Sequence, residues 1–317
     1  MKFLLPLPSD ESVIGSASGR VLQPGEGGVY AVWAPLENEE LRLGPFLKIR
    51  GARAGEHISR LKMTFAEFHL LIDCSCLGNR EFTGSGYRKI RNGLEYLRGS
   101  GVDSVIVSSP YILEIAVRAL PGIKAGVARE AFVDSPRRAL YWQKMGADFI
   151  VLPETVMSRD FRTLAAVRSN VSCSLFMPAN SACLGACPFS TNPDGGAACD
   201  FSCRELLRGH PEYAFTRGCW IRPGDSGIYA SLGIDGLWIF PAHKNGASLP
   251  EIAAAYRGNT YNGDLRRLLP DENYGGIKLE NKLLDGFLKD LPCADGDMAC
   301  GGCGYCASWL RKTGEIC

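Results

Sequence analysis

The chain has 317 residues, with 35 Lys and Arg against 34 Asp and Glu, so its formal net charge is +1. This length excludes a disulfide-stapled miniprotein and suits one large α/β domain or two modest ones. The balanced charge gives no global attraction to nucleic acid or to a membrane surface, although a local basic patch stays open.

The first residues, MKFLLPLPSD, contain one basic residue and a short apolar run. Pro6 and Pro8 interrupt the run, and no small-residue cleavage site follows, which argues against a secretory signal peptide. No apolar segment approaches the ~20 residues of a membrane-spanning helix. We therefore expect a cytoplasmic protein without a membrane span.

Eight short apolar or β-branched runs follow one another along the chain, and each is typical of a buried strand in a parallel sheet. These runs are residues 1–8, 29–36, 68–75, 102–110, 123–132, 147–154, 173–180 and 235–242. Amphipathic helical patterns follow five of them, at residues 84–101, 110–120, 135–146, 158–170 and 248–258. Ser135 before Pro136, and Ser248 before Pro250, have the pattern of a capping serine with proline in the first turn.

This alternation predicts a TIM-like (β/α)8 barrel over residues 1–290 rather than an open doubly wound sheet. No glycine-rich dinucleotide fingerprint follows any strand, which weakens the Rossmann alternative. Residues 291–317 are rich in Cys and Gly and are predicted to form a metal-binding tail. Chemistry in such barrels lies on the loops that follow the strands. The loop that begins at Asn180, after the seventh strand, is therefore expected over the barrel mouth.

The thirteen cysteines are clustered, and an odd number in a reducing compartment is hard to explain by disulfides. Cys173 suits a small buried hydrophobic residue. Two groups instead have the spacing of metal ligands in Gly- and Pro-rich loops. The first group is Cys183, Cys187, Cys199, Cys203 and Cys219, and the second is Cys293, Cys300, Cys303, Cys306 and Cys317.

The first group could hold zinc or an iron–sulfur cluster, since both take four thiolates. Structural zinc sites usually pair cysteines as C-x2-C, whereas Cys183 and Cys187 are spaced C-x3-C, as are Cys199 and Cys203. This spacing favours iron–sulfur, although the C-x3-C-x2-C pattern of radical-SAM enzymes is not met. In the tail, Cys300, Cys303 and Cys306 resemble the ferredoxin run, so Cys293 and these three residues could hold a second cluster or zinc.

Several longer segments resemble the peptidase U32 family. They are NSACLGACP, WIRPGDSGIYASLGIDGLWIF, AYRGNTYNGDLRRLL and NYGGIKLENKLLDGFL. The resemblance runs from about residue 65 onward and is most specific between residues 180 and 270. It implies a TIM-like barrel with a cysteine-ligated [4Fe–4S] cluster. Similar members hydroxylate ubiquinone precursors or RNA bases without oxygen, and others are named proteases or collagenases.

The family's ligand positions map onto this chain in more than one way. We expect Cys183, Cys187, Cys199 and Cys203 as the ligands, with Cys219 as a substitute. Other members take a ligand from an early strand, where Cys74 and Cys76 stand here. The family often has Arg after Cys-Pro, but this chain has Phe189, so a shared substrate contact there is in doubt.

Polar residues at strand ends are candidates for proton transfer, because burial near a cluster can tune an acid. The predicted catalytic residues are Asp73, Glu130, Glu154 and His243. Arg129, Asn180 and Lys244 stand at similar positions. Arg222 and Asp225 are expected to pair and to fix their loop rather than to do chemistry.

We therefore expect an iron–sulfur enzyme of the U32 type that carries out an oxygen-independent redox modification, specifically a hydroxylation, of a small molecule or biosynthetic intermediate. Two alternatives stay open. One is an electron-transfer subunit that pairs with a homologous or redox partner protein, and the other is a zinc-stabilised hydrolase or peptidase. The sequence shows no Ser/His/Asp order and no H-E-x-x-H motif, which weakens the peptidase alternative.

Overall fold

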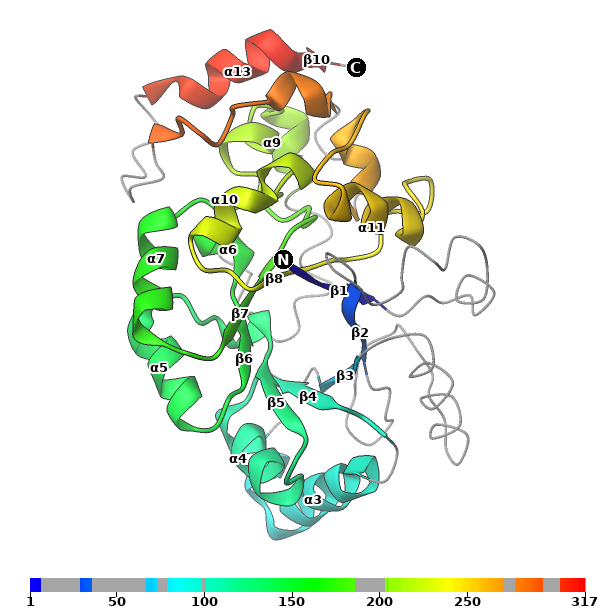
Figure 1. Ribbon diagram of the computed structural model, residues 1–317, viewed down its shortest axis with the longest axis vertical. Coiled ribbons are helices and arrows are strands. Elements are labelled where there is room, and N and C mark those ends of the chain that lie inside the picture. Colours follow the sequence, from blue (N-terminus) through cyan, green and yellow to red (C-terminus); the bar gives the residue numbers. More distant parts are fainter. Residues whose placement is uncertain are drawn as a thin grey trace.

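The fold is an eight-stranded parallel barrel, seen in a computed structural model that describes residues 1–6, 29–35, 67–72, 79–98, 101–185, 203, 205–270, 277–292 and 303–316 (Figure 1). The strands are β1 (Lys2–Pro6), β2 (Val29–Pro35), β3 (Glu67–Ile72), β4 (Ser104–Val107), β5 (Lys124–Val127), β6 (Phe149–Val151), β7 (Ser174–Pro178) and β8 (Gly236–Trp238). They pair in chain order, and β1 pairs with β8 to close the barrel. The predicted α/β class and the predicted parallel barrel are confirmed.

Helices follow each strand from β3 onward. Their bounds are η3 (Arg80–Phe82), α3 (Gly84–Arg98), α4 (Pro110–Ala119), η4 (Arg129–Ala131), α5 (Pro136–Lys144), α6 (Glu154–Met157), α7 (Phe161–Asn170), α9 (Tyr213–Thr216), η5 (Pro223–Asp225), α10 (Ser226–Ser231), α11 (Leu249–Arg257), η6 (Leu265–Leu268) and η7 (Asn281–Leu284). The five predicted helices are confirmed as α3, α4, α5, α7 and α11. Ser248 forms a capping box with Glu251, whereas the Ser135 side chain makes no capping hydrogen bond.

Alternate residues of each strand face opposite sides of the barrel wall. In β4, Val105 and Val107 belong to the large core between strands and helices, whereas Ile106 belongs to a smaller inner core. Rings from β2, β6, β7 and β8 fill the barrel interior together with Ile106. These rings are Trp33, Phe149, Phe176 and Trp238.

Two inward-facing glycines leave room for these rings. A Cβ atom on Gly126 would lie 2.2 Å from Phe149 Cζ, and one on Gly236 would lie 2.6 Å from Phe176 Cε1. Both distances are far below a carbon–carbon contact. The aromatic filling of the barrel therefore depends on glycine at these two positions.

A partly buried polar cluster lies toward the amino-terminal ends of β3 and β5. His69 Nε2 donates to Glu67 Oε2 over 2.9 Å, and Lys124 Nζ donates to Glu67 Oε1 over 2.7 Å. Burial alone would raise the pKa of Glu67, but the bonds from His69 and Lys124 outweigh it and lower the pKa to about 2. The cluster lies at the amino-terminal end of the barrel, opposite the end where such barrels carry their active sites, and polar residues at this end serve stability.

The chain's last described segment folds back onto the rest of the protein. Strand β10 (Gly314–Ile316) pairs antiparallel with β9 (Ile277–Leu279), and α13 (Tyr305–Thr313) packs beside α9 (Figure 1). Tyr305 Oη donates to the Phe287 carbonyl over 2.8 Å, and the two rings stack. Cys303 is exposed and Cys306 is buried, whereas Cys293, Cys300 and Cys317 lie outside the described residues. The predicted boundary at residues 290/291 and the metal-binding tail stay predictions.

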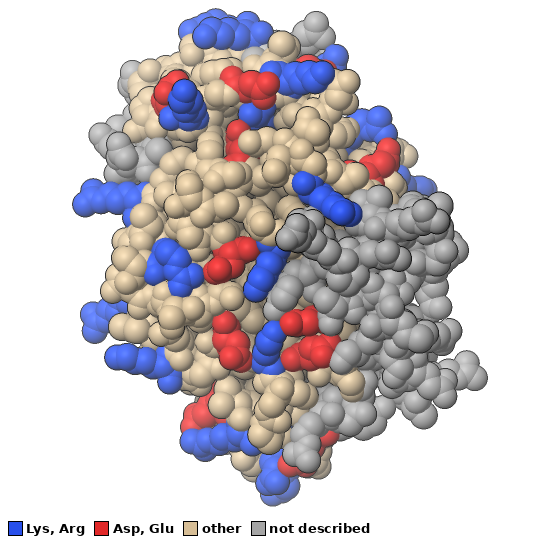
Figure 2. Space-filling model, viewed as in Figure 1, with Lys and Arg blue, Asp and Glu red and all other residues tan. Residues whose placement is uncertain are grey.

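Charged side chains of both signs are interspersed over the face shown in Figure 2. This agrees with the net charge of +1. Among the helices that the structure describes, none has the length and apolarity needed to cross a membrane.

Candidate functional site

Side chains from four consecutive strand ends meet at the carboxyl-terminal mouth of the barrel. Arg129 lies in η4 after β5, Glu154 begins α6 after β6, Ser181 follows β7 and Phe240 follows β8. Arg129 Nη1 and Ser181 Oγ both donate to Glu154 Oε1, the second over 2.9 Å. The Arg129 guanidinium carbon lies 4.9 Å from the centre of the Phe240 ring. The Arg129 side chain therefore reaches across the mouth from β5 toward β8.

Two of the predicted ligands, Cys183 and Cys219, lie opposite each other on neighbouring backbone segments. Leu184 and Gly218 form an antiparallel bridge, and the Cys219 amide donates to the Cys183 carbonyl over 3.1 Å. Residues directly opposite in such a bridge send their side chains to the same side, with Cβ atoms about 5 Å apart. The bridge therefore brings together two thiols that are far apart in the sequence.

The cysteine pair is joined to the polar group at the mouth. The Cys183 amide donates to Ser181 Oγ over 3.1 Å, and Ser181 Oγ in turn donates to Glu154. Ser181 is 2 % exposed and Glu154 is 1 % exposed. A continuous chain of hydrogen bonds thus runs from Arg129 through Glu154 and Ser181 to the backbone of Cys183.

The electrostatics of this region follow from burial and close charges. Burial raises the pKa of the Cys219 thiol well above its usual value; Glu154 and Cys183 act in the same direction, and Arg159 opposes them. Burial alone would lower the pKa of Arg129, but Glu154, Glu130 and Cys183 outweigh it and hold the pKa high. Arg129 is therefore a permanent cation, and a thiolate at Cys219 needs further positive charge beside it.

Paired thiols are soft ligands of the kind that hold zinc or iron–sulfur clusters, and a bound metal supplies the positive charge that deprotonates them. Cys183 and Cys219 therefore fit such a centre as two of its ligands. Cys187 and Cys199 lie outside the described residues, and Cys203 packs half-buried against the core. Within the described part of the chain, no three or more His, Cys, Asp or Glu side chains form a group that could hold a metal ion.

The predicted catalytic residues differ in their surroundings. Glu130 accepts a 2.8 Å hydrogen bond from Arg129 Nε, and its side chain is 32 % exposed. Glu154 is enclosed by the contacts already given. His243 is half-buried after β8, and its backbone amide donates to the Leu269 carbonyl. Asp73 lies outside the described residues. The structure thus brings Glu130 and Glu154 together through Arg129.

Asn180 fastens the end of β7 to its neighbours. Its Nδ2 donates to the carbonyls of Phe240 and Leu268 over 2.8 and 2.7 Å, and its Oδ1 accepts from the Phe240 amide over 2.8 Å. All of its amide groups are engaged within the protein, and the side chain is fully buried. Asn180 therefore fixes the start of the cysteine loop.

Arg222 and Asp225 pair as predicted. Arg222 Nε and Nη2 donate to the two carboxylate oxygens over 2.8 and 2.9 Å, and Nη1 donates to the Asn281 carbonyl over 2.6 Å. Both side chains are buried. The pair fixes its loop and ties η7 to it.

Sequence reasoning overlooked two residues near the cysteines. Ser181 stands two positions before Cys183, and its neighbour Asn180 had drawn attention instead. Arg159 is buried, with its guanidinium carbon 5.1 Å from the ring centres of both Trp220 and Phe287. Proximity to a cysteine could have pointed to Ser181. For Arg159 no sequence signal exists, because its ring partners follow much later in the chain.

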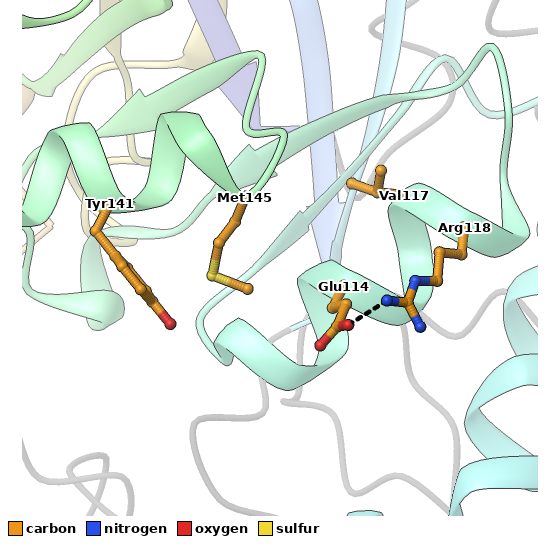
Figure 3. Close-up of a pocket in the computed structure, with 5 residues that line it drawn as sticks. All are labelled: Glu114, Val117, Arg118, Tyr141 and Met145. Carbon is orange, nitrogen blue, oxygen red and sulfur yellow. Dashed lines mark ion pairs between the residues drawn. The ribbon is translucent and has the colours of Figure 1, made fainter.

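A surface pocket of about 410 Å³ lies away from the mouth, between α4 and α5 (Figure 3). Glu114, Val117 and Arg118 line it from α4, and Tyr141 and Met145 line it from α5 and the turn after it. Its charged members, Glu114 and Arg118, already pair with each other over 2.6 Å. The charged groups of this pocket are thus engaged with each other, and the barrel mouth stays the candidate site.

Comparison with known proteins supports the family resemblance. The model of peptidase family U32 matches residues 74–210. A curated protein of Methanocaldococcus jannaschii, "Uncharacterized protease MJ1657", is 28 % identical over 275 residues, which cover 82 % of this chain and 81 % of that protein. The solved structure titled "The Structure of the U32 Peptidase Mk0906" has a TM-score of 0.54 at 18 % identity, and covers 77 % of this chain and 94 % of that one. The first two matches carry the resemblance and the third supports the fold, so the chain is similar to the peptidase U32 family, most directly over residues 74–210.

Proposed function

We propose that this protein is an iron–sulfur enzyme of the U32 family that carries out an oxygen-independent redox modification, specifically a hydroxylation, of a small molecule. The observation that carries the proposal is the pairing of Cys183 with Cys219 at the mouth of the barrel, beside Arg129 and Glu154. Active sites of such barrels lie at this end.

The proposed ligands are drawn from Cys183, Cys187, Cys199, Cys203 and Cys219. The sequence favours the first four, whereas the bridge between Leu184 and Gly218 supports Cys219 as a ligand together with Cys183. A [4Fe–4S] cluster takes four thiolates, so Cys219 would replace one of the others. Because Cys303 is exposed, its thiol is accessible as a ligand of a second metal centre in the tail.

When bound, an iron–sulfur cluster supplies one-electron transfer or an iron that acts as a Lewis acid. Replacing C–H by C–OH with water as the oxygen source releases two electrons and two protons. A redox partner protein or a small-molecule acceptor must take the electrons. Glu130 is half-exposed beside Arg129 and is the described acid best placed to pass protons to solvent.

Peptide hydrolysis is the second candidate, because the two relatives carry protease and peptidase names. The described residues favour it less. Ser181 is buried and its hydroxyl donates to Glu154. His69 lies at the opposite end of the barrel, and His210 pairs with Glu212 near the surface. His243 follows β8 at the mouth, but Ser181 is bonded to Glu154 and Cys183 and not to His243. A serine nucleophile needs a histidine base within hydrogen-bond reach.

Anaerobic purification, followed by an absorption spectrum and by iron, sulfide and zinc analysis, tests the proposal. About four irons per chain are expected for one [4Fe–4S] cluster and about eight for two. Cys183→Ser and Cys219→Ser should lose iron. Cys173→Ala is the matched control, because Cys173 is a core residue whose thiol pKa burial raises to about 11. A colourless protein that contains zinc and no iron would contradict the proposal and favour the hydrolase.

A further inference from the structure

We propose that Ser181 and Glu154 are positioning residues that hold the backbone of Cys183 in place for metal ligation. This inference rests on the proposed function, in which Cys183 is a ligand. It adds a role for Ser181, which no sequence motif marks, and it changes the role of Glu154 from proton transfer to support.

The geometry of Ser181 points to this role. Its hydroxyl accepts from the Cys183 amide over 3.1 Å and donates to Glu154 Oε1 over 2.9 Å. The side chain is 2 % exposed, so the hydroxyl is closed off from solvent and substrate. One hydroxyl thus joins the cysteine loop after β7 to the first residue of α6.

Glu154 is held from its other side. Arg129 donates to the same Oε1 atom, while Arg129 Nε is bound to Glu130 and its guanidinium lies over Phe240. The Arg129 cation balances the buried carboxylate, which would otherwise be costly to enclose. The Glu154 carboxylate that fixes Ser181 is therefore held by Arg129 of η4, which in turn lies against Phe240 after β8.

The opposite side of Cys183 is fastened independently. Its carbonyl accepts from the Cys219 amide, and the Gly185 amide donates to the Arg217 carbonyl. Loss of the Ser181 hydroxyl would therefore release the Cys183 amide while the bridge to Cys219 stays. Metal sites lose affinity when groups that orient their ligands are removed, typically by 10–100-fold.

The experiment compares Ser181→Ala, Ser181→Thr and Glu154→Gln with the matched control Ser226→Ala. Ser226 is also 2 % exposed and bonded through its hydroxyl, but to the Pro223 carbonyl and to Asn259. Two rates are measured in each full-length variant. One is iron release from the anaerobic holoprotein to the chelator bipyridyl, and the other is iodoacetamide alkylation of Cys183 in the reduced apoprotein, followed by peptide mass spectrometry.

We expect Ser181→Ala to speed both rates on the order of tenfold and Glu154→Gln to speed them less, since glutamine keeps an acceptor oxygen. Ser181→Thr should return both rates toward wild type, and Ser226→Ala should leave them unchanged even where its melting temperature falls. Equal rates in Ser181→Ala and Ser226→Ala would overturn the inference. A wild-type protein without iron would refute the proposed iron–sulfur function. The support of Cys183 by Ser181 would still be decided by the alkylation rates, because they are measured in the apoprotein.

Discussion

The substitution Gly126→Ala tests whether the barrel interior is filled as the structure has it. The new Cβ atom would lie 2.2, 2.4 and 2.7 Å from three atoms of the Phe149 ring. The ring has little room to move, because it lies 5.3 Å from the His69 ring and 5.6 Å from the Phe176 ring, centre to centre. Overpacking of this kind costs typically 1–3 kcal/mol, and the three close contacts place Gly126→Ala near about 3 kcal/mol.

A double-mutant cycle in urea measures this clash directly. Phe149→Leu alone removes buried ring atoms and should cost about 2 kcal/mol. In the double variant the smaller side chain makes room for the Cβ atom, so the total cost should fall below the sum of the single costs by about 2 kcal/mol. Gly93→Ala in α3 is the matched control, because a Cβ atom there meets nothing within 4 Å. It should stabilise the protein by about 0.5–1 kcal/mol.

Additive costs in the cycle, or a Gly126→Ala variant as stable as Gly93→Ala, would refute the reasoning. Either result would mean that the Phe149 ring does not lie over Gly126. The unfolding free energy should be taken from the urea midpoint at an unchanged slope, so that a change in the unfolded state is not mistaken for strain.

Two further predictions concern ion pairs. The folded-state pKa of Glu67 is about 2 against an ordinary value of 4.5, so its ionised form stabilises the fold above pH 4.5, and this contribution is lost as the pH falls to about 2. Glu67→Gln should therefore cost about 1–2 kcal/mol at pH 7, less than the whole pKa shift implies because solvent screens the pair with the exposed Lys124, and almost nothing near pH 2. Urea unfolding across this range measures the cost, and a gap independent of pH would contradict the prediction. Arg222→Ala should cost about 3–5 kcal/mol, because it leaves Asp225 buried without its bidentate partner, whereas Arg222→Ala/Asp225→Ala should recover part of that loss in the same assay.

The strands of this fold were predictable because both faces of each strand are buried. In β4, Val105 and Val107 pack against helices while Ile106 faces the inner core, so the run is apolar throughout. The aromatic filling was harder to foresee. Gly126 gives no hint in the sequence that it faces a phenylalanine from the next strand, since that pairing depends on the register of the closed barrel.

The candidate site was predictable only in part, because its contacts join distant segments. The position of Glu154 at a strand end was enough to predict it as a site residue, and the C-x3-C spacing was enough to predict Cys183 as a ligand. The hydrogen bonds of Glu154 connect residues 25 and 27 positions away, in two other loops. Such pairings follow from the order of strands around the barrel rather than from local pattern.

Glu130 and Glu154, the two predicted acids at the mouth, show that strand-end position alone does not decide the role of a residue. Both follow a strand, and both contact Arg129. Glu154 is 1 % exposed, and one of its oxygens accepts from both Arg129 and Ser181, so its carboxylate is engaged in holding the cysteine loop. Glu130 keeps a side chain that is 32 % exposed and accepts a hydrogen bond from Arg129 Nε, so it faces solvent while it contacts Arg129. For this reason we propose Glu130 rather than Glu154 for proton transfer, and Glu154 for the support of Cys183.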